Sequence, residues 1–201
     1  MERKNALVSV FNKDGVVEFV WDLVDLGWRI ISSGGTARVL AAAGVPVTDV
    51  AEISGLPAIL GHRVVTLVPQ IHGGLLATED QMAELESLGY PWIDLVCVDL
   101  YPLQAEIARP GATRESVIDK TDIGGPTMIR SGAKGRRLVI VDSDDRNVVL
   151  AHLLANEPNS AEFRNYLAAK AEGIVAEYCL ASANYHSDGK IYGFFTGLRE
   201  T

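Results

Sequence analysis

Residues 28–44 read Trp-Arg-Ile-Ile-Ser-Ser-Gly-Gly-Thr-Ala-Arg-Val-Leu-Ala-Ala-Ala-Gly, and this stretch decides the fold. Residues 28–31 predict a strand that runs directly into a Ser-Ser-Gly-Gly-Thr turn. Apolar residues at helical spacing follow and stop at Gly44, which predicts a helix. Residues 6–27 show the same order of strand and helix. This alternation predicts an α/β fold, with an open, mainly parallel sheet and helices on its faces.

The turn Ser33-Gly34-Gly35-Thr36 suits an anionic group. Glycines expose backbone N–H groups, the two hydroxyls are further donors, and the dipole of the following helix favours negative charge. A glycine-rich turn with a Ser/Thr cap is an equally common explanation. Lys13 follows the first strand and is expected at the same sheet edge, where ligands of open α/β sheets gather. This favours a phosphate site formed by Lys13 and the turn.

A second candidate site is the segment 120–134, Lys-Thr-Asp-Ile-Gly-Gly-Pro-Thr-Met-Ile-Arg-Ser-Gly-Ala-Lys. Asp122 precedes Gly124 and Gly125, and the helix expected to follow them carries Lys134 near its far end. An acid, a donor-rich turn and an amine in one short segment predict polar chemistry. The same residues also describe an N-capped helix with no further role, and the segment by itself leaves both explanations open.

Tyr101 is a third candidate, because it follows the most convincing buried strand, residues 93–100, and so falls at the same edge. Tyr before Pro is also a common way to leave a sheet. Residues 56–74 have no clean period, and an irregular stretch of this length is often functional. Other expected elements are strands at 45–50 and 136–141, helices at 80–88, 113–120, 126–134, 148–154 and 160–185, and an ambiguous tail compatible with a strand at 190–195.

The composition argues against several classes of function. A net charge of −8 and a pI near 5.0 argue against a nucleic-acid-binding face, which needs clustered Lys and Arg. Cys97 and Cys179 lie far apart in apolar surroundings, and no metal-binding spacing of Cys and His occurs, so we expect reduced thiols and no metal. No stretch has the length and apolarity of a signal peptide or a membrane span. We expect a cytoplasmic protein, with a nucleotide-binding domain at 1–145 and a helical extension at 146–201 packed on it as one unit.

With these motifs, the chain resembles the N-terminal cyclohydrolase domain of the bifunctional purine-biosynthesis protein, from about residue 7 to about residue 184. The resemblance implies a methylglyoxal-synthase-like fold, a homodimer, no cofactor, and dehydrative ring closure of formyl-AICAR (FAICAR) to inosine monophosphate (IMP). Members of the family usually continue into a transformylase domain, so a separate AICAR transformylase is an expected partner. The matching segments are Ser9-Val10 with Lys13, and residues 31–37, 47–50, 61–74, 99–102 and 121–134.

The resemblance also assigns roles to individual residues. It implies that the phosphate and ribose of the nucleotide are bound by Lys13, Ser33, Gly34, Gly35, Thr36, Arg63 and Thr66. It implies catalysis by Tyr101, Asp122 and Lys134, with the backbone of Gly124 and Gly125 near the reacting groups. Most of these residues are also candidates on their chemistry alone.

One segment departs from the family pattern. Where the family typically reads Arg-Val-Lys-Thr-Leu-His-Pro, residues 63–69 read Arg-Val-Val-Thr-Leu-Val-Pro, so Val65 replaces a catalytic lysine and Val68 a histidine. A lost cation removes transition-state stabilisation. Three interpretations follow: a cyclohydrolase, with reduced activity or not; a catalytically weakened nucleotide-binding homologue that acts as a sensor or partner subunit; and a different small-molecule lyase on the same fold. The segment around Asp122 and the Tyr101-Pro102 pair favour the first.

Overall fold

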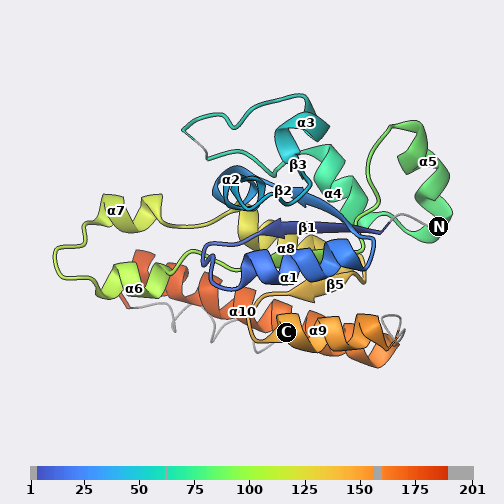
Figure 1. The fold of residues 1–201 in the computed structure, drawn as a ribbon. Helices are drawn as coiled ribbons and strands as arrows, with labels where there is room; N and C mark the ends of the chain where they lie inside the picture. The colour runs from blue at the N-terminus through green and yellow to red at the C-terminus, as the bar shows by residue number, and fades with distance from the viewer. Residues whose placement is uncertain (1–3, 62, 156–159, 190–201) are drawn as a thin grey trace.

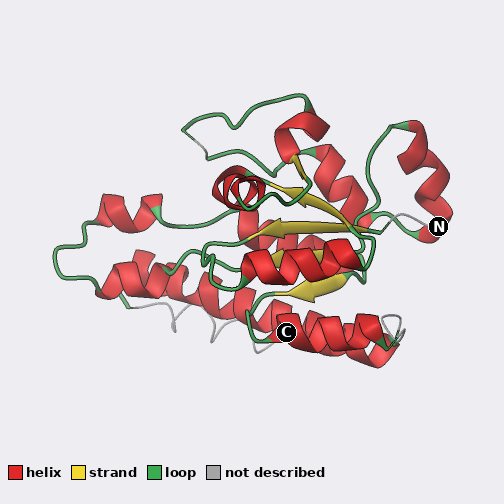
Figure 2. Ribbon diagram, viewed as in Figure 1, coloured by secondary structure: helices red, strands yellow, loops and turns green. Residues whose placement is uncertain are grey.

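The computed structural model describes residues 4–61, 63–155 and 160–189, which form a five-stranded sheet with helices on both faces (Figures 1 and 2). Its strand pairs are all parallel, and the spatial order is β3-β2-β1-β4-β5. The predicted α/β class with a parallel sheet is confirmed. The strands are β1 (Asn5–Ser9), β2 (Arg29–Ser32), β3 (Val47–Asp49), β4 (Leu95–Val98) and β5 (Leu138–Ile140).

Helices connect the strands and cover the sheet. Helices α1 (Val16–Asp25) and α2 (Gly34–Ala42) follow β1 and β2, as the sequence predicts. The others are α3 (Val50–Ser54), α4 (Pro69–Leu76), α5 (Met82–Ser87) after the 3-10 helix η1 (Glu79–Gln81), α6 (Leu103–Ala108), α7 (Arg114–Asp119), α8 (Gly124–Lys134), α9 (Asp145–Leu154) and α10 (Ala161–His186).

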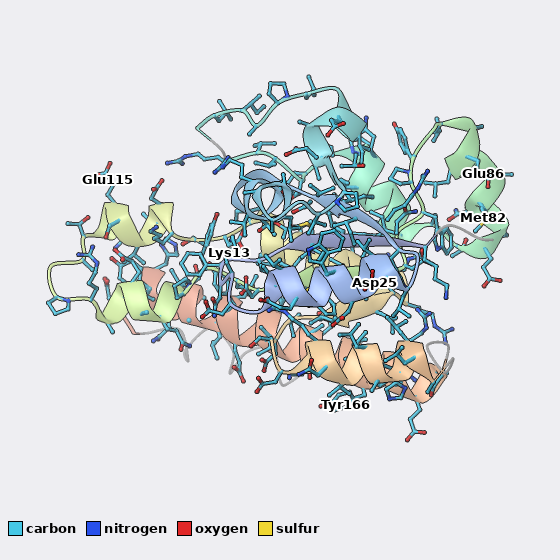
Figure 3. All side chains as sticks on the ribbon, viewed as in Figure 1. Lys13, Asp25, Met82, Glu86, Glu115 and Tyr166 are labelled. Atoms are coloured by element: carbon cyan, nitrogen blue, oxygen red, sulfur yellow. The ribbon has the colours of Figure 1, made fainter. Side chains whose placement is uncertain are left out.

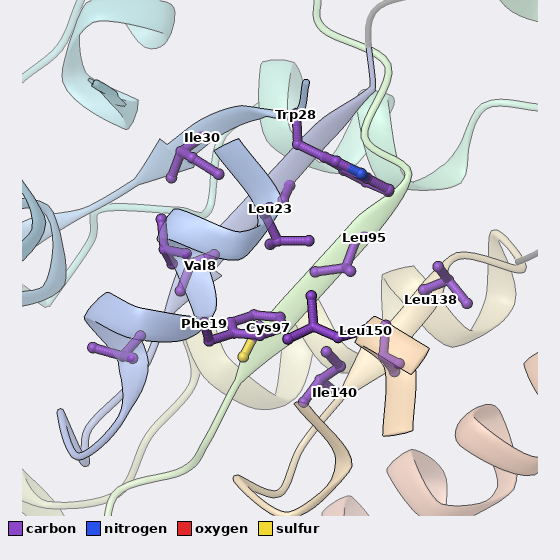
Figure 4. Packing of buried hydrophobic residues seen from close by; sticks show 14 of the residues in the cluster. Val8, Phe19, Leu23, Trp28, Ile30, Leu95, Cys97, Leu138, Ile140 and Leu150 are labelled. Carbon is purple, nitrogen blue, oxygen red and sulfur yellow. The ribbon is translucent and has the colours of Figure 1, made fainter. Parts of the chain in front are cut away.

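Two apolar clusters lie on opposite faces of the sheet. Successive strand residues point to opposite faces, so Val8 belongs to the cluster under α1 and α9, and Leu7 belongs to the cluster under α4 and α8. Figure 4 shows part of the first cluster, in which Phe19 and Leu23 of α1 pack on the strands. Burying one such side chain contributes about 1.5–3 kcal/mol, so the strands are fixed mainly by packing.

Helix α10 joins the two clusters at the β5 side of the sheet. Phe163 and Leu167 near its start pack in the first cluster, whereas Ala171 and Val175 pack in the second. It runs from beside α9 toward α6 (Figure 1). The long helix expected at 160–185 is thus present, and the strand suggested at 190–195 lies outside the described residues.

Several elements differ from the prediction, and two of them lie between residues 45 and 74. The strand expected at 45–50 ends at Asp49, because the Asp49 side chain accepts from Ala51 N–H and Glu52 accepts from Asp49 N–H, a capping box that starts α3. The stretch expected to be irregular to residue 74 becomes helical at Pro69, which occupies the first turn of α4 without needing an N–H partner.

Helix α4 includes a glycine that packing demands. A methyl group on Gly74 would lie 2.1 Å from the Pro91 carbonyl oxygen, so glycine is required there by close approach.

Helix α6 directly after Pro102 was not expected, and α8 begins at Gly124 rather than at residue 126. That last shift places the first turn of α8 beside Asp122.

Candidate active site

The loops after β1, β2 and β4 and the start of α8 meet at one edge of the sheet. In a parallel sheet all strand ends share an edge, and a connecting helix begins there because it runs antiparallel to the strands. Figure 1 shows this edge toward α6 and α7, away from α5. Figure 3 shows Lys13 there, and Met82 and Glu86 of α5 at the opposite end.

Lys13 lies beside the first turn of α2, as predicted. Its ammonium donates to the carbonyl oxygens of Val10 and Phe11, the latter at 3.0 Å. A methyl group built on Gly35 would lie 4.0 Å from Lys13 Cε and 3.8 Å from a guanidinium nitrogen of Arg38. Burial lowers the pKa of Lys13, and Asp99 opposes that shift. Two cations thus flank the start of α2. Arg38 was missed because it lies in the middle of the helix in the sequence, whereas its side chain lies beside the turn one helical period earlier.

The two hydroxyls of the 33–36 turn have different surroundings. Ser33 is the N-cap of α2 and its Oγ lies 3.2 Å from Ser9 Oγ. Thr36 is only 2% exposed, and its hydroxyl accepts from Val10 N–H at 3.1 Å and donates to Val10 O at 3.0 Å. The Thr36 hydroxyl therefore ties the turn to β1, and the expectation that it is a donor to phosphate is not supported.

Asp122 lies at the start of α8 and is held from two sides. Its Oδ1 accepts from Gly125 N–H at 2.9 Å, and its own N–H donates to the Tyr178 hydroxyl at 2.6 Å. A methyl group on Gly125 would lie 2.4 Å from Asp122 Oδ2, so the carboxylate rests directly on that glycine. Burial raises the pKa of Asp122 and the charge of Asp99 adds to this, while N–H groups of Gly125 and Gly124 act in the opposite direction.

Tyr101 follows β4 and lies near Asp122. Its ring makes an edge-to-face contact with Phe11, with 5.4 Å between centroids, and it remains 44% exposed. Burial raises the pKa of the Tyr101 phenol, and the charge of Asp122 adds to that rise. The structure thus brings Tyr101 and Asp122 close together, with the Tyr101 side chain partly exposed.

Asp99 was not proposed from its own chemistry, although it stands in a quoted motif. Its carboxylate accepts from the backbone N–H groups of Phe11 and Asn12, the latter at 3.0 Å. It therefore shapes the loop that carries Lys13 and contributes the negative charge that acts on both Lys13 and Asp122. An acidic residue directly after a buried strand was the available signal.

The 63–68 segment reaches the site through Thr66. Thr66 is buried, and a methyl group on Gly124 would lie 3.0 Å from its hydroxyl oxygen. Arg63 instead points to Asp119 of α7 at 2.6 Å, in a pair whose side chains are 69% and 62% exposed. Val65 and Val68 are half-buried, and Val68 packs against the second apolar cluster.

Lys134 is not brought to the other candidates. It is the last residue of α8, it is exposed, and Gly124 is the first residue of that helix. Ten residues of α-helix span about 15 Å, which places Lys134 toward the amino edge of the sheet. The prediction that Lys134 converges with Asp122 within this chain does not agree with the structure.

A hollow of about 260 Å³ between α6 and α10 is lined by Gln104, Ile107, Ala181, Asn184 and Tyr185. Within 4–61, 63–155 and 160–189, no group of three or more His, Cys, Asp or Glu side chains is arranged to hold a metal ion. No helix in these ranges is both long and apolar enough to cross a membrane.

Comparison with known proteins identifies the family of the chain. Residues 15–127 match the model of the MGS-like domain. The chain is 46% identical to the bifunctional purine biosynthesis protein PurH of Neisseria gonorrhoeae, over 98% of this chain and 37% of that protein, and 47% identical to PurH of Bacillus cytotoxicus, over 91% and 37%. The chain therefore spans just over a third of the length of these relatives.

A solved structure is also similar. The crystal structure of ForH superposes with a TM-score of 0.81 at 35% identity, covering 94% of this chain and 99% of that one. The family match spans more than half of the chain, including the turn at the start of α2, the β4 loop and the start of α8. The chain belongs to the MGS-like domain family.

Proposed function

We propose that this protein is an IMP cyclohydrolase, which closes FAICAR to IMP with loss of water. The observation that carries the proposal is Asp122 at the first turn of α8, beside Tyr101 and on the same edge as Lys13 and the 33–36 turn. Its support outside the site is the identity with PurH proteins over nearly the whole chain.

The reaction needs little chemical machinery. The carboxamide nitrogen of FAICAR attacks the formyl carbon of the same molecule and loses a proton. The resulting carbinol oxygen is protonated and leaves as water, and the formamido nitrogen loses its proton as the new C=N bond forms. Because both reacting groups belong to one molecule, holding the reactive conformer supplies much of the rate.

The residues at the edge have matching roles. The Asp122 carboxylate accepts the proton from the carboxamide nitrogen, and its raised pKa makes it a better base than an ordinary aspartate. The positive end of α8 stabilises negative charge on the formyl oxygen. Tyr101 supplies a hydroxyl for proton transfer to that oxygen. Lys134 has no role in this scheme, because of its distance from Asp122.

The phosphate of the nucleotide is bound at the start of α2. The donors are the backbone N–H groups of residues 34–36, the Ser33 hydroxyl and the Lys13 ammonium, with Arg38 at the rim. Thr66 lies against the first turn of α8, and we assign it a contact with the ribose or the base. Arg63 joins these residues when the nucleotide displaces its exposed partner Asp119, a pair of the kind that contributes less than about 1 kcal/mol.

We further propose a cytoplasmic homodimer that works together with an AICAR transformylase activity. The chain buries Phe163, Leu167 and Val175 of α10 internally, so less apolar surface is left for a partner than the sequence suggested. Tyr166 and Leu180 remain exposed on that helix. Light scattering at micromolar concentration should give twice the mass of the chain, and a monomer would remove the dimer from the proposal.

A nucleotide-binding protein without catalysis is the second candidate. It is favoured by Val65 and Val68, because neither position carries a cation or a proton donor and Val68 packs against the core. The decisive experiment follows IMP formation from FAICAR by chromatography, with wild type, Asp122→Asn and no protein. The cyclohydrolase is supported if wild type exceeds the other two. Equal rates in all three, with IMP still bound in calorimetry, would establish the binder.

A further inference from the structure

The site includes a contact from outside the segment that matches the family model. The match ends at residue 127, and α10 begins at Ala161. From α10, the Tyr178 hydroxyl reaches the segment that precedes α8: it accepts from Asp122 N–H at 2.6 Å and donates to Lys120 O at 3.3 Å. One side chain thus spans the two peptide groups on either side of Thr121.

This contact holds the backbone of Asp122, the residue proposed as the proton acceptor. The Asp122 backbone is held by Tyr178, and its carboxylate is held by Gly125 N–H at 2.9 Å. Asp122 is packed tightly between these two contacts, because a methyl group on Gly125 would lie 2.4 Å from Asp122 Oδ2. A small movement of the Asp122 backbone would therefore weaken the hydrogen bond to Gly125 or turn the carboxylate away from Tyr101.

We propose that Tyr178 is a positioning residue: from α10 it sets the backbone of Asp122 so that the carboxylate faces the reacting groups. This rests on the cyclohydrolase function proposed above and adds to it that the site is incomplete without α10. Misplacement by about 1 Å is sufficient to slow a reaction that depends on orientation.

The contact is separable from the packing of α10. Ala171 and Val175 pack in the second cluster, and Phe163 and Leu167 in the first, without help from the Tyr178 hydroxyl. Tyr178→Phe keeps the ring and removes only the oxygen, so the helix should stay in place. Tyr166→Phe is the matched control, because Tyr166 is on the same helix with its ring exposed (Figure 3).

Kinetics test the role in catalysis. For Tyr178→Phe we expect kcat to fall about 10-fold, the effect of one lost hydrogen bond at a positioned group, with KM unchanged because the phosphate is bound elsewhere. The hydrogen bond from Gly125 N–H lowers the pKa of Asp122, because it stabilises the ionised carboxylate. Weakening this bond therefore raises that pKa and moves the acid limb of the pH–kcat profile to higher pH. The titratable groups around Asp122 are Asp99, Tyr101 and Tyr178 itself. Tyr166→Phe should leave kcat, KM and the profile as in wild type.

A spectroscopic measurement tests the contact independently of turnover. Protein labelled with ¹⁵N-aspartate gives an Asp122 amide signal, assigned by its loss in Asp122→Asn. In Tyr178→Phe that amide proton should move upfield and exchange faster with solvent, while other aspartate amides stay unchanged. If wild type shows no turnover, the cyclohydrolase proposal fails while the amide still decides whether Tyr178 positions Asp122. An unchanged amide, or an unchanged kcat and pH profile in an active enzyme, would overturn the inference.

Discussion

The hydroxyl of Thr66 faces the first turn of α8 so closely that a methyl group on Gly124 would lie 3.0 Å from its oxygen. The segment with the two unusual valines is therefore anchored directly against the helix that presents Asp122. Val65 adjoins Thr66 and is half-buried. Position 65 is therefore one residue away from a side chain that contacts the first turn of α8.

Val65→Lys should raise turnover. A well-placed cation supplies about 1.4–4 kcal/mol of transition-state stabilisation, which corresponds to roughly 10- to 1000-fold in kcat. Val65→Met is the matched control, because it has similar length and no charge. A lysine variant no faster than the methionine variant would show that the pocket does not use a cation at this position.

Asp122→Asn should remove about 10²- to 10⁴-fold of the rate and leave the affinity for IMP nearly unchanged. The wild-type rate should fall on the acid side as the carboxylate is protonated. Because burial raises the pKa of Asp122, the midpoint of that fall should lie above 3.8, the ordinary value. A rate that stays constant down to pH 4 would exclude Asp122 as the base.

Two glycines of α8 should respond differently to alanine. In Gly125→Ala the new methyl group would lie 2.4 Å from Asp122 Oδ2 and 2.8 Å from Leu100, so turnover should be lost. In Gly132→Ala it would lie 2.6 Å from Val96 in the core, so the main effect should be about 1–3 kcal/mol of lost stability. Thermal unfolding beside kinetics separates the two, and the reverse pattern would contradict the assignment.

Lys13→Met should weaken IMP binding about 10- to 100-fold in calorimetry, as expected for one charge-assisted hydrogen bond. Inosine, which has no phosphate, should bind the variant and wild type equally. Lys4→Met is a matched control, because Lys4 precedes β1 at the opposite edge and lies over the Trp28 ring. Equal losses for IMP and inosine would move the phosphate away from Lys13.

Lys134→Ala should leave turnover within about 3-fold of wild type, as is usual for an exposed residue far from the chemistry. The reason is its place at the last position of α8, about 15 Å from the first. Loss of turnover in this variant would mean that Lys134 reaches the site of a second chain. Mixing Lys134→Ala with Asp122→Asn would then restore part of the activity.

Local patterns predicted much of the fold and the placement of several candidate site residues. The alternation of strands and helices predicts the parallel sheet, and a parallel sheet brings Lys13, Tyr101 and Asp122 to one edge, so their order along the chain was sufficient. Lys134 was proposed because it shares a short segment with Asp122, and the resemblance assigned it to catalysis. The helix expected in that segment is present and is eleven residues long, so it separates the two side chains instead of bringing them together.

Contacts between distant segments could not be predicted in this way. Thr36 looked like a phosphate donor because its neighbours are glycines, yet its hydroxyl bonds to Val10, 26 residues away. Tyr178 and Asp122 are 56 residues apart, and a tyrosine on an amphipathic helix carries no local sign of such a partner. Which side chains form hydrogen bonds with which partners depends on tertiary packing, and the periodicity of apolar residues in the sequence does not encode that packing.

The pairing of β1 with β4 has a consequence for the order of folding. Ala6 pairs with Leu95, so the centre of the sheet closes a loop of about 90 residues, whereas β1 and β2 are joined through a single helix. Non-local pairing of this kind is slow, because the entropy of loop closure is lost before the contacts form. On the ribosome, β1 would wait with one open edge until residues 95–98 emerge. Asp99 and Tyr101 arrive immediately behind them, so the same late event that completes the sheet also assembles the reacting edge.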